Sequence, residues 1–159
     1  MDNTANNQIL AACMDDQDDW LNDLLGQGDF DISFTDDNGN TALHYAAMNG
    51  SLACLELLVR VAGIEINRKN TRGTTPLHYA VSFQDDTDVA LEMVNVLLDA
   101  GANPKIQDAN KQSPLSVAST RPDDDDMKEL LSSVLMEDEV VDDYAQEDDD
   151  DIDDSMAVE

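Results

Sequence analysis

The sequence has few basic residues. Eight Lys and Arg stand against 36 Asp and Glu among 159 residues, and the formal net charge is −28. A surface this acidic is repelled by the phosphates of DNA and RNA, so we expect no direct nucleic-acid partner. The same charge attracts basic molecules. The composition therefore favours another protein, of basic character, as the partner.

Long apolar runs are also missing. No stretch is long enough to span a bilayer, and no apolar segment near Met1 resembles a signal peptide, so we expect no membrane association. The two cysteines, Cys13 and Cys54, occupy apolar positions of predicted helices. We expect buried, reduced thiols rather than a disulfide. These features indicate a cytoplasmic protein, with the nucleus also open.

The residues that an enzyme needs are scarce. There are two histidines, His44 and His78, and the two cysteines form no Cys-x-x-Cys pair. No phosphate-binding glycine loop is present. The aspartate runs lack the glycine and terminal glutamate of an EF-hand calcium loop. We therefore expect no enzymatic activity, no catalytic residue, no metal site and no cofactor.

One motif recurs along the chain. Residues 39–50 read Gly-Asn-Thr-Ala-Leu-His-Tyr-Ala-Ala-Met-Asn-Gly, residues 73–81 read Gly-Thr-Thr-Pro-Leu-His-Tyr-Ala-Val, and residues 112–118 read Gln-Ser-Pro-Leu-Ser-Val-Ala. Thr41 and Thr75 are 34 residues apart, and Thr75 and Ser113 are 38 apart. Apolar residues at helical spacing follow the first two copies. This self-similarity predicts a stack of structural repeats.

Each part of the motif has a physical reason. Thr41 and Thr75 are positioned to cap a helix, and Pro76 suits the first helical turn, where its missing N–H is harmless. Comparing the copies places five extra residues of the second repeat within residues 82–90. We expect that insertion in a loop, where extra residues are tolerated.

The motif resembles the ankyrin repeat, whose signature is a Thr-Pro-Leu-His turn that opens the first of two helices. The resemblance implies an all-α solenoid of helix-turn-helix units with short hairpin fingers. We predict a frayed N-terminus over residues 1–5 and a repeat domain over residues 6–135. Within it lie an N-terminal cap (6–35), two full repeats (36–69 and 70–107) and a C-terminal cap (108–135). In the first cap we expect Trp20 to lie in the core with Leu24.

The end of the sequence has a different composition. Residues 137–159 contain thirteen Asp or Glu and no Lys or Arg. Such a segment repels itself and has too little apolar surface to fold. We therefore predict a disordered acidic tail over residues 136–159. It either solubilises the protein or clamps a basic partner, and we favour the clamp.

The resemblance also suggests where a partner binds. Ankyrin proteins bind other proteins through their finger tips and the exposed face of their first helices. Phe83, beside the insertion, is a candidate hot spot, with partial burial under the insertion as the alternative. Residues 68–72 are either a partner contact or a solvated basic turn. The candidate contacts are Asp37, Asn38, Asn40, Met48, Asn49, Lys69, Thr71, Arg72, Thr74, Ser82 and Phe83.

Aspartate runs precede the second helix of three predicted units, at residues 15–19, 85–88 and 123–126. One or two carboxylates per helix would serve as caps, and these runs contain more. Stacking would align the runs along one edge as an acidic rim that attracts basic partners. The predicted rim comprises Asp85, Asp86, Asp88, Asp123, Asp124, Asp125 and Asp126.

In plan, the chain is similar to small fungal cytosolic ankyrin proteins with an acidic tail, one of which chaperones a small-subunit ribosomal protein. The leading hypothesis is a chaperone or escort, monomeric when free, for a basic client such as a ribosomal protein or translation factor. The alternative is an adaptor or inhibitor that docks on a folded regulator such as a kinase or proteasome subunit.

Overall fold

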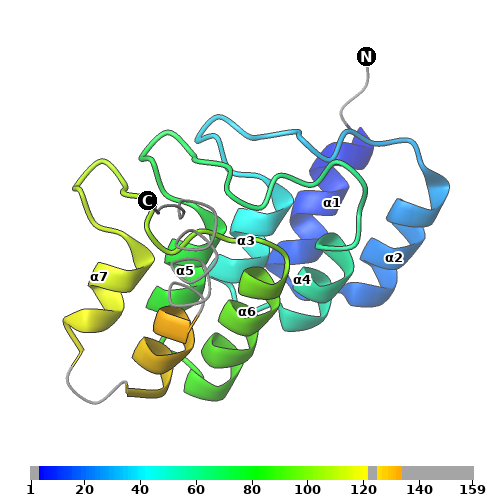
Figure 1. The fold of residues 1–159 in the computed structure, drawn as a ribbon. Coiled ribbons are helices and arrows are strands. Elements are labelled where there is room, and N and C mark those ends of the chain that lie inside the picture. Colours follow the sequence, from blue (N-terminus) through cyan, green and yellow to red (C-terminus); the bar gives the residue numbers. More distant parts are fainter. Residues whose placement is uncertain (1–3, 122–124, 134–159) are drawn as a thin grey trace, which may run out of the picture.

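The fold was taken from a computed structural model, which describes residues 4–121 and 125–133. This part of the chain contains no strand, and its helices follow one another as an array (Figure 1). Residues 125–133 are also helical, and the predicted tail over residues 136–159 lies outside the described residues. The helices are α1 (Thr4–Met14), α2 (Asp18–Gln27), α3 (Ala42–Met48), α4 (Leu52–Leu58), α5 (Pro76–Ser82), α6 (Thr87–Asp99) and α7 (Pro114–Ser119).

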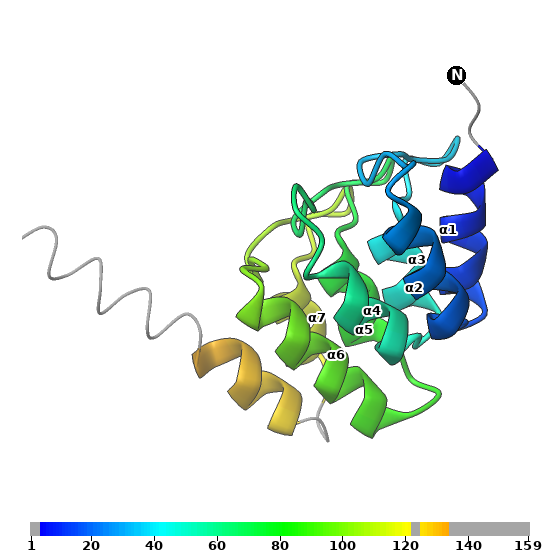
Figure 2. The ribbon, with the colours of Figure 1, turned by 90° about the vertical axis from the view of Figure 1, so that its right-hand side faces the viewer.

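The helices form two parallel rows. The first row is α1, α3, α5 and α7, and each helix contacts the next; α2, α4 and α6 form the second row, which continues into residues 125–133 (Figure 2). The loops between repeats project from one edge, which we call the finger edge. The turns within repeats lie at the opposite edge, which we call the turn edge (Figure 1). The apolar core runs between the rows, from Ile9 to Leu131.

The first helices of the repeats begin with the same cap. Thr41, Thr75 and Ser113 have extended backbones, and each side chain accepts a hydrogen bond from the backbone N–H three residues later. The side chain of that third residue accepts in turn from the N–H of the cap residue. Two N–H groups that a helix start leaves without partners are thereby satisfied. The capping role predicted for Thr41 and Thr75 is confirmed, and Ser113 caps its helix in the same way.

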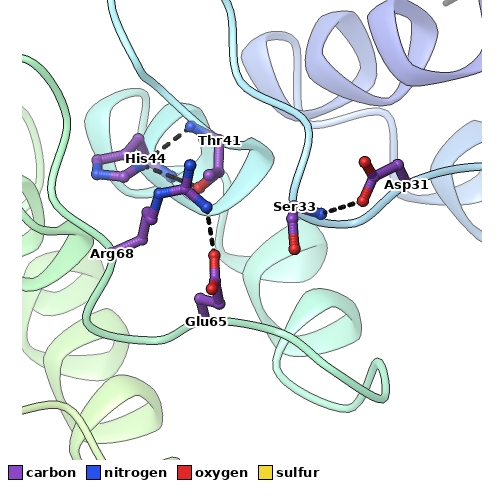
Figure 3. A network of polar contacts seen from close by, with 6 residues as sticks. All are labelled: Asp31, Ser33, Thr41, His44, Glu65 and Arg68. Atoms are coloured by element: carbon purple, nitrogen blue, oxygen red, sulfur yellow. Dashed lines mark hydrogen bonds and ion pairs between the residues drawn. The ribbon is translucent and has the colours of Figure 1, made fainter.

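The two histidines connect one repeat to the next. Nδ1 of His44 accepts from the N–H of Thr41 at 3.0 Å, so the proton of the neutral ring lies on Nε2 (Figure 3). Nε2 donates to the carbonyl of Thr74, 30 residues away, at 3.0 Å. His78 repeats the arrangement and donates to the Gln112 carbonyl at 2.8 Å. Both histidines are buried, and both ring nitrogens of each take part in hydrogen bonds within the repeat stack.

The last repeat is built as an end unit. Ser116 replaces the histidine, and its hydroxyl bonds only within its own turn, to the N–H of Ser113 at 2.8 Å and to the carbonyl of Ser113 at 2.9 Å. Lys111 replaces the turn glycine and adopts the same left-handed backbone, with φ at 64°. At Gly39 and Gly73 the next finger packs against the glycine. At Lys111 no further finger follows in the described chain, so a side chain fits.

Close packing of the fingers explains the two glycines. The N–H of Thr71 donates to the Asn38 carbonyl at 3.0 Å, which joins the first finger to the second. A β-carbon on Gly39 would lie 3.0 Å from the Thr71 nitrogen, and the φ of Gly39 is 76°. Gly73 meets the third finger in the same way. These positions therefore require glycine for both space and conformation.

The insertion in the second repeat differs from the prediction. It was expected in a loop. The connection between α5 and α6 is residues 83–86, whereas the connection between α3 and α4 is residues 49–51, so only one of the five added residues lengthens the loop. The other four extend the start of α6 by about one turn. Asp86 makes this extension possible, because its Oδ1 accepts from the N–H groups of Asp88 and Val89 at 3.1 and 3.3 Å and caps the longer helix.

One prediction for the N-terminal cap was wrong. Trp20 was expected in the core, but it is 38% exposed. The first turns of α2 direct Leu21 and Leu24 into the core instead, and α2 lies at the end of its row (Figure 1). Residues 4 and 5 begin α1, and residues 1–3 lie outside the described residues, so the fraying of residues 1–5 stays a prediction. The Asn6 side chain holds this helix by accepting from the N–H of Asp31 at 2.7 Å.

Cys13 and Cys54 are free thiols in the core, between the N-terminal cap and the first full repeat. The Cys54 thiol donates to the Ala12 carbonyl at 3.6 Å. A hydrogen bond between the two thiols, together with burial, raises the pKa of Cys13 far above its ordinary value. The Cys13 thiol therefore stays protonated. Both cysteines are buried and free, which confirms the prediction of buried, reduced thiols.

The burial of His44 predicts a pH dependence. Burial lowers the pKa of His44, while its hydrogen bond to the Thr74 carbonyl opposes that shift. A histidine whose pKa is lowered in the folded state contributes its full stabilisation of the fold at pH values above its unfolded pKa of about 6.5. Below that pH the unfolded chain binds the proton more readily than the folded one, so the contribution is lost. The free-energy advantage of the parent over His44→Gln should shrink by up to about 2 kcal/mol between about pH 7.5 and pH 5. Urea unfolding of both proteins measures it. Comparing two equally acidic proteins cancels the general charge effect, and an advantage independent of pH would contradict the prediction.

The left-handed backbone of Lys111 predicts a stabilising substitution. This conformation costs a residue with a β-carbon about 1–2 kcal/mol, and the greater freedom of glycine in the unfolded chain offsets part of that. Lys111→Gly should raise the free energy of unfolding by about 0.5–1 kcal/mol, measured by denaturant titration. Gly39→Ala is the counterpart and should destabilise, because it adds both strain and a contact with the next finger. A destabilised Lys111→Gly protein would refute the assignment.

Candidate protein-binding surfaces

The predicted contact residues form two groups at opposite edges. Asp37, Asn38, Lys69, Thr71 and Arg72 are exposed at the finger edge. The remaining accessible members lie at the C-terminal ends of α3 and α5, near the turn edge. The exposed ones are Asn49 and Ser82, and the half-buried ones are Met48 and Phe83. The structure therefore does not bring the whole predicted set together.

Two predicted contacts have structural roles. Asn40 is 6% exposed, and its Oδ1 accepts from Nδ2 of Asn70 at 2.8 Å, a bond between neighbouring fingers. Thr74 is half-buried, and its carbonyl accepts a hydrogen bond from Nε2 of His44. A partner on the finger edge would therefore contact residues around these two. Asn40 and Thr74 hold the fingers in place.

Side-chain turns that the sequence analysis missed give the fingers their shape. Oδ1 of Asp36 accepts from the N–H groups of Asn38 and Asn40 at 2.9 and 3.0 Å. Asn70 and Asp108 make the same pair of bonds in the second and third fingers. All three precede the cap residue by five positions. That spacing of an Asp or Asn before the Thr or Ser cap is the signal that would have identified them.

Two tyrosines on the first helices fasten the fingers. The Tyr45 hydroxyl donates to Oδ2 of Asp36, and Nδ2 of Asn70 donates to the Tyr79 hydroxyl at 3.0 Å. Burial and the bond to Asp36 raise the pKa of Tyr45. Burial acts to raise the pKa of Asp36, but the hydrogen bonds that its carboxylate accepts from Tyr45, Asn40 and Asn38 outweigh burial and lower it. The finger edge therefore carries a fixed carboxylate and a prearranged backbone.

Cationic side chains are concentrated at the second finger. Lys69 and Arg72 are exposed there. Arg68 is held in an ion pair with Glu65, three residues earlier (Figure 3). The nearby exposed Asp37 and Asn38 make the finger edge a surface of mixed charge. This chemistry suits a folded partner with its own mixture of polar groups.

The turn edge is acidic. Asp85, Asp86, Asp88, Asp125 and Asp126 are exposed around the start of α6 and of residues 125–133, whereas the predicted rim residues Asp123 and Asp124 lie outside the described residues. Asp86 is engaged as the helix cap. The carboxylates of the others extend the charge beyond what capping requires.

The acidic rim is interrupted. The turn between α3 and α4 is residues 49–51, Asn-Gly-Ser, which separates the N-terminal aspartates of residues 15–19 from the cluster at α6. The predicted continuous rim is therefore two clusters. We keep the name acidic rim for the C-terminal cluster, Asp85, Asp86, Asp88, Asp125 and Asp126.

Phe83 lies beside the turn that separates the two clusters. A β-carbon on Gly50 would collide with three carbons at the tip of the Phe83 ring, so the ring packs against the turn of the preceding repeat. That turn contributes to the partial burial of Phe83. The ring also lines a groove of about 600 Å³ that contains side chains of Asp88, Asp125 and Asp126. The structure thus joins the predicted hot spot to the predicted acidic rim.

Within the described chain, no group of three or more His, Cys, Asp or Glu side chains is arranged to hold a metal ion. No helix among the described residues has the length and apolar character needed to cross a membrane.

Comparison with known proteins places this geometry in a family. Residues 9–108 match the family model described as ankyrin repeats in three copies. The chain is 38% identical over 112 residues to human ankyrin repeat domain-containing protein 53, and 32% identical over 115 residues to the mouse protein of that name. These matches cover 70% and 72% of this chain but 21% and 23% of the relatives, so the chain spans about a fifth of their length.

A third relative shows how widely such segments are distributed. Human transient receptor potential cation channel subfamily A member 1 is 36% identical over 84 residues, which are 52% of this chain and 7% of the channel. Ankyrin segments therefore occur in proteins of unlike activity, and fold alone does not assign a role. The family model covers more than half of the sequence, and the capped, stacked helix pairs agree with it. The chain belongs to the ankyrin-repeat family.

Proposed function

We propose that this ankyrin-repeat protein is an escort for a basic client protein, such as a ribosomal protein or translation factor. The observation that carries the proposal is the acidic rim, which sets exposed carboxylates beside an apolar groove at one end of the turn edge. A newly made basic protein presents both positive charge and unpaired apolar surface. A surface with carboxylates around apolar side chains is complementary to both.

Charge has a kinetic role in this proposal. The chain carries a net charge of −28, and thirteen of its acidic residues lie in residues 137–159. Such a field raises the rate at which basic molecules arrive, and salt weakens it. Contacts with apolar side chains then slow release, because they persist when salt screens the charges. The escort thus uses charge for capture and apolar contact for retention.

A second function is favoured by the finger edge. Its tips are exposed, of mixed charge, and held by bonds between fingers such as Thr71 to Asn38 at 3.0 Å. Because the fingers are already ordered, little conformational entropy is lost when a partner binds. Such a surface suits an adaptor or inhibitor that docks on a folded regulator such as a kinase or proteasome subunit. This function would use Lys69 and Arg72 rather than the acidic rim.

Affinity purification from cell extract with the full chain distinguishes the two functions. The bait is the parent, a rim variant with Asp85, Asp88 and Asp125 changed to Asn, or a finger variant with Lys69 and Arg72 changed to Ala. Asp86 is left intact because it caps α6. If the protein is an escort, the parent should recover a basic protein that is released at high salt, and the rim variant should not recover it. Recovery of a neutral, salt-resistant partner that only the finger variant loses would establish the adaptor instead.

Binding kinetics with the recovered client give a sharper prediction. The rim variant should associate about tenfold more slowly at low salt, with a flatter salt dependence and little change in dissociation. Phe83→Ala should mainly speed dissociation, by a factor of about five to ten. Thermal unfolding of each variant checks that the fold persists, since Phe83 also packs on Gly50. Rim substitutions that altered only dissociation would contradict the division of roles.

A further inference from the structure

The groove at the acidic rim has an apolar wall and floor. Phe83 forms one wall, and Leu91 and Met127 approach from α6 and from residues 125–133. Phe83 and Leu91 are half-buried, whereas Met127 is 1% exposed and belongs to the core. The groove of about 600 Å³ therefore reaches inward to the core and falls within the size range of binding pockets.

The sequence insertion builds this groove. Gln84, Thr87, Asp88 and Ala90 all line it, and all lie within the segment that holds the five added residues. The extra turn of α6 that the insertion creates carries three of them. The repeat of residues 36–69 has no such extension. The groove is thus specific to this end of the stack.

The charges of the groove are arranged unevenly. Asp88, Asp125 and Asp126 line it and are exposed. Arg121 is the cation of the lining, and its guanidinium donates to the Val81 carbonyl at 2.6 Å, which fixes it against α5. Asp125 also lies 3.9 Å from Lys128, an exposed and weak pair. Carboxylates therefore outnumber cations along the opening.

A second groove provides a contrast. It has a volume of about 350 Å³ and lies between α2 and α4. It too is acidic, with Asp18, Asp19 and Glu56, but its apolar lining is limited to Ala53 and Leu57, and Arg60 lies in it. This groove has the charge without an apolar floor. The groove at Phe83 combines both.

We propose that the groove at Phe83 binds a single apolar side chain from an extended, lysine- or arginine-rich segment of a protein, with Asp88, Asp125 and Asp126 pairing with the flanking cations. The inference rests on the proposed escort function and adds the recognition element of the client. An apolar anchor placed in a pocket with a charged surround is the usual form of an interface hot spot. The excess of carboxylates selects basic flanks over acidic ones.

The test uses the full chain and synthetic peptides. The probe is a short fluorescent peptide with one central leucine between flanks of alternating lysine and glycine. A second peptide has serine in place of leucine, and a third has glutamate in place of every lysine. Fluorescence anisotropy at low salt should rank the leucine peptide about tenfold tighter than the serine peptide, with no binding of the glutamate peptide.

Two matched pairs of variants locate the site. Asp88→Lys reverses a charge that lines the groove, and Glu92→Lys makes the same change one helical turn along α6, away from the lining. Leu91→Ala shortens a lining side chain, and Val96→Ala shortens a half-buried side chain of α6 outside it. Asp88→Lys should weaken both lysine peptides about tenfold, and Leu91→Ala should weaken only the leucine peptide, about fivefold or more. Val96→Ala should bind like the parent, and Glu92→Lys should weaken the lysine peptides clearly less than Asp88→Lys does, because it acts only through the general field. Circular dichroism confirms that each variant is folded.

The outcomes separate this inference from the function on which it rests. If the lysine peptides bind equally well with leucine or serine, or if Asp88→Lys and Glu92→Lys act alike, basic segments bind the acidic surface elsewhere and the groove assignment is wrong while the escort function stands. If neither lysine peptide binds, both proposals are overturned. The comparison of the leucine and serine peptides needs only the parent protein, so it tests the groove assignment even if a variant does not fold.

Discussion

The buried histidine hydrogen bonds are the interaction on which the stack depends. Nδ1 of His44 and of His78 accepts a hydrogen bond from the N–H of the cap residue of its own helix, and Nε2 donates one to a backbone carbonyl of the next finger. Each ring thus completes a local helix start and makes a contact across 30 or 34 residues of sequence. A solenoid has few other long-range ties, since each unit touches only its neighbours. The fingers, their glycines and the side-chain turns all follow from keeping that carbonyl in place.

What the sequence could predict was mostly local. The caps at Thr41 and Thr75 and the buried cysteines follow from residue type and spacing, and these predictions are confirmed. The extension of α6 was missed because an insertion in a repeat has the same length whether it forms a loop or a helix. Trp20 was misplaced because helical periodicity cannot show that a helix stands at the end of its row. The contact of Phe83 with Gly50 joins two repeats and has no counterpart in either copy of the motif.

The two edges of the stack present different chemistry. The finger edge offers a rigid surface of mixed charge, and the turn edge offers carboxylates around an apolar groove. A partner held at one edge leaves the other accessible, because the helices separate them (Figure 2). The family assignment alone would direct attention to the fingers and first helices. The acidic rim is a property of this sequence, and whether a partner requires it distinguishes the two proposed functions.

The contact between Phe83 and Gly50 also limits how such a protein can evolve. Repeat arrays change by duplicating, deleting and shuffling whole units, which works when neighbouring surfaces are equivalent. Here the second repeat fits only behind a repeat whose turn has a glycine with φ near 69°, and any side chain there would meet the ring. Drift at either position alone is restricted, so the pair is expected to change together. The packing of the Phe83 ring on Gly50 therefore constrains the order of these two repeats.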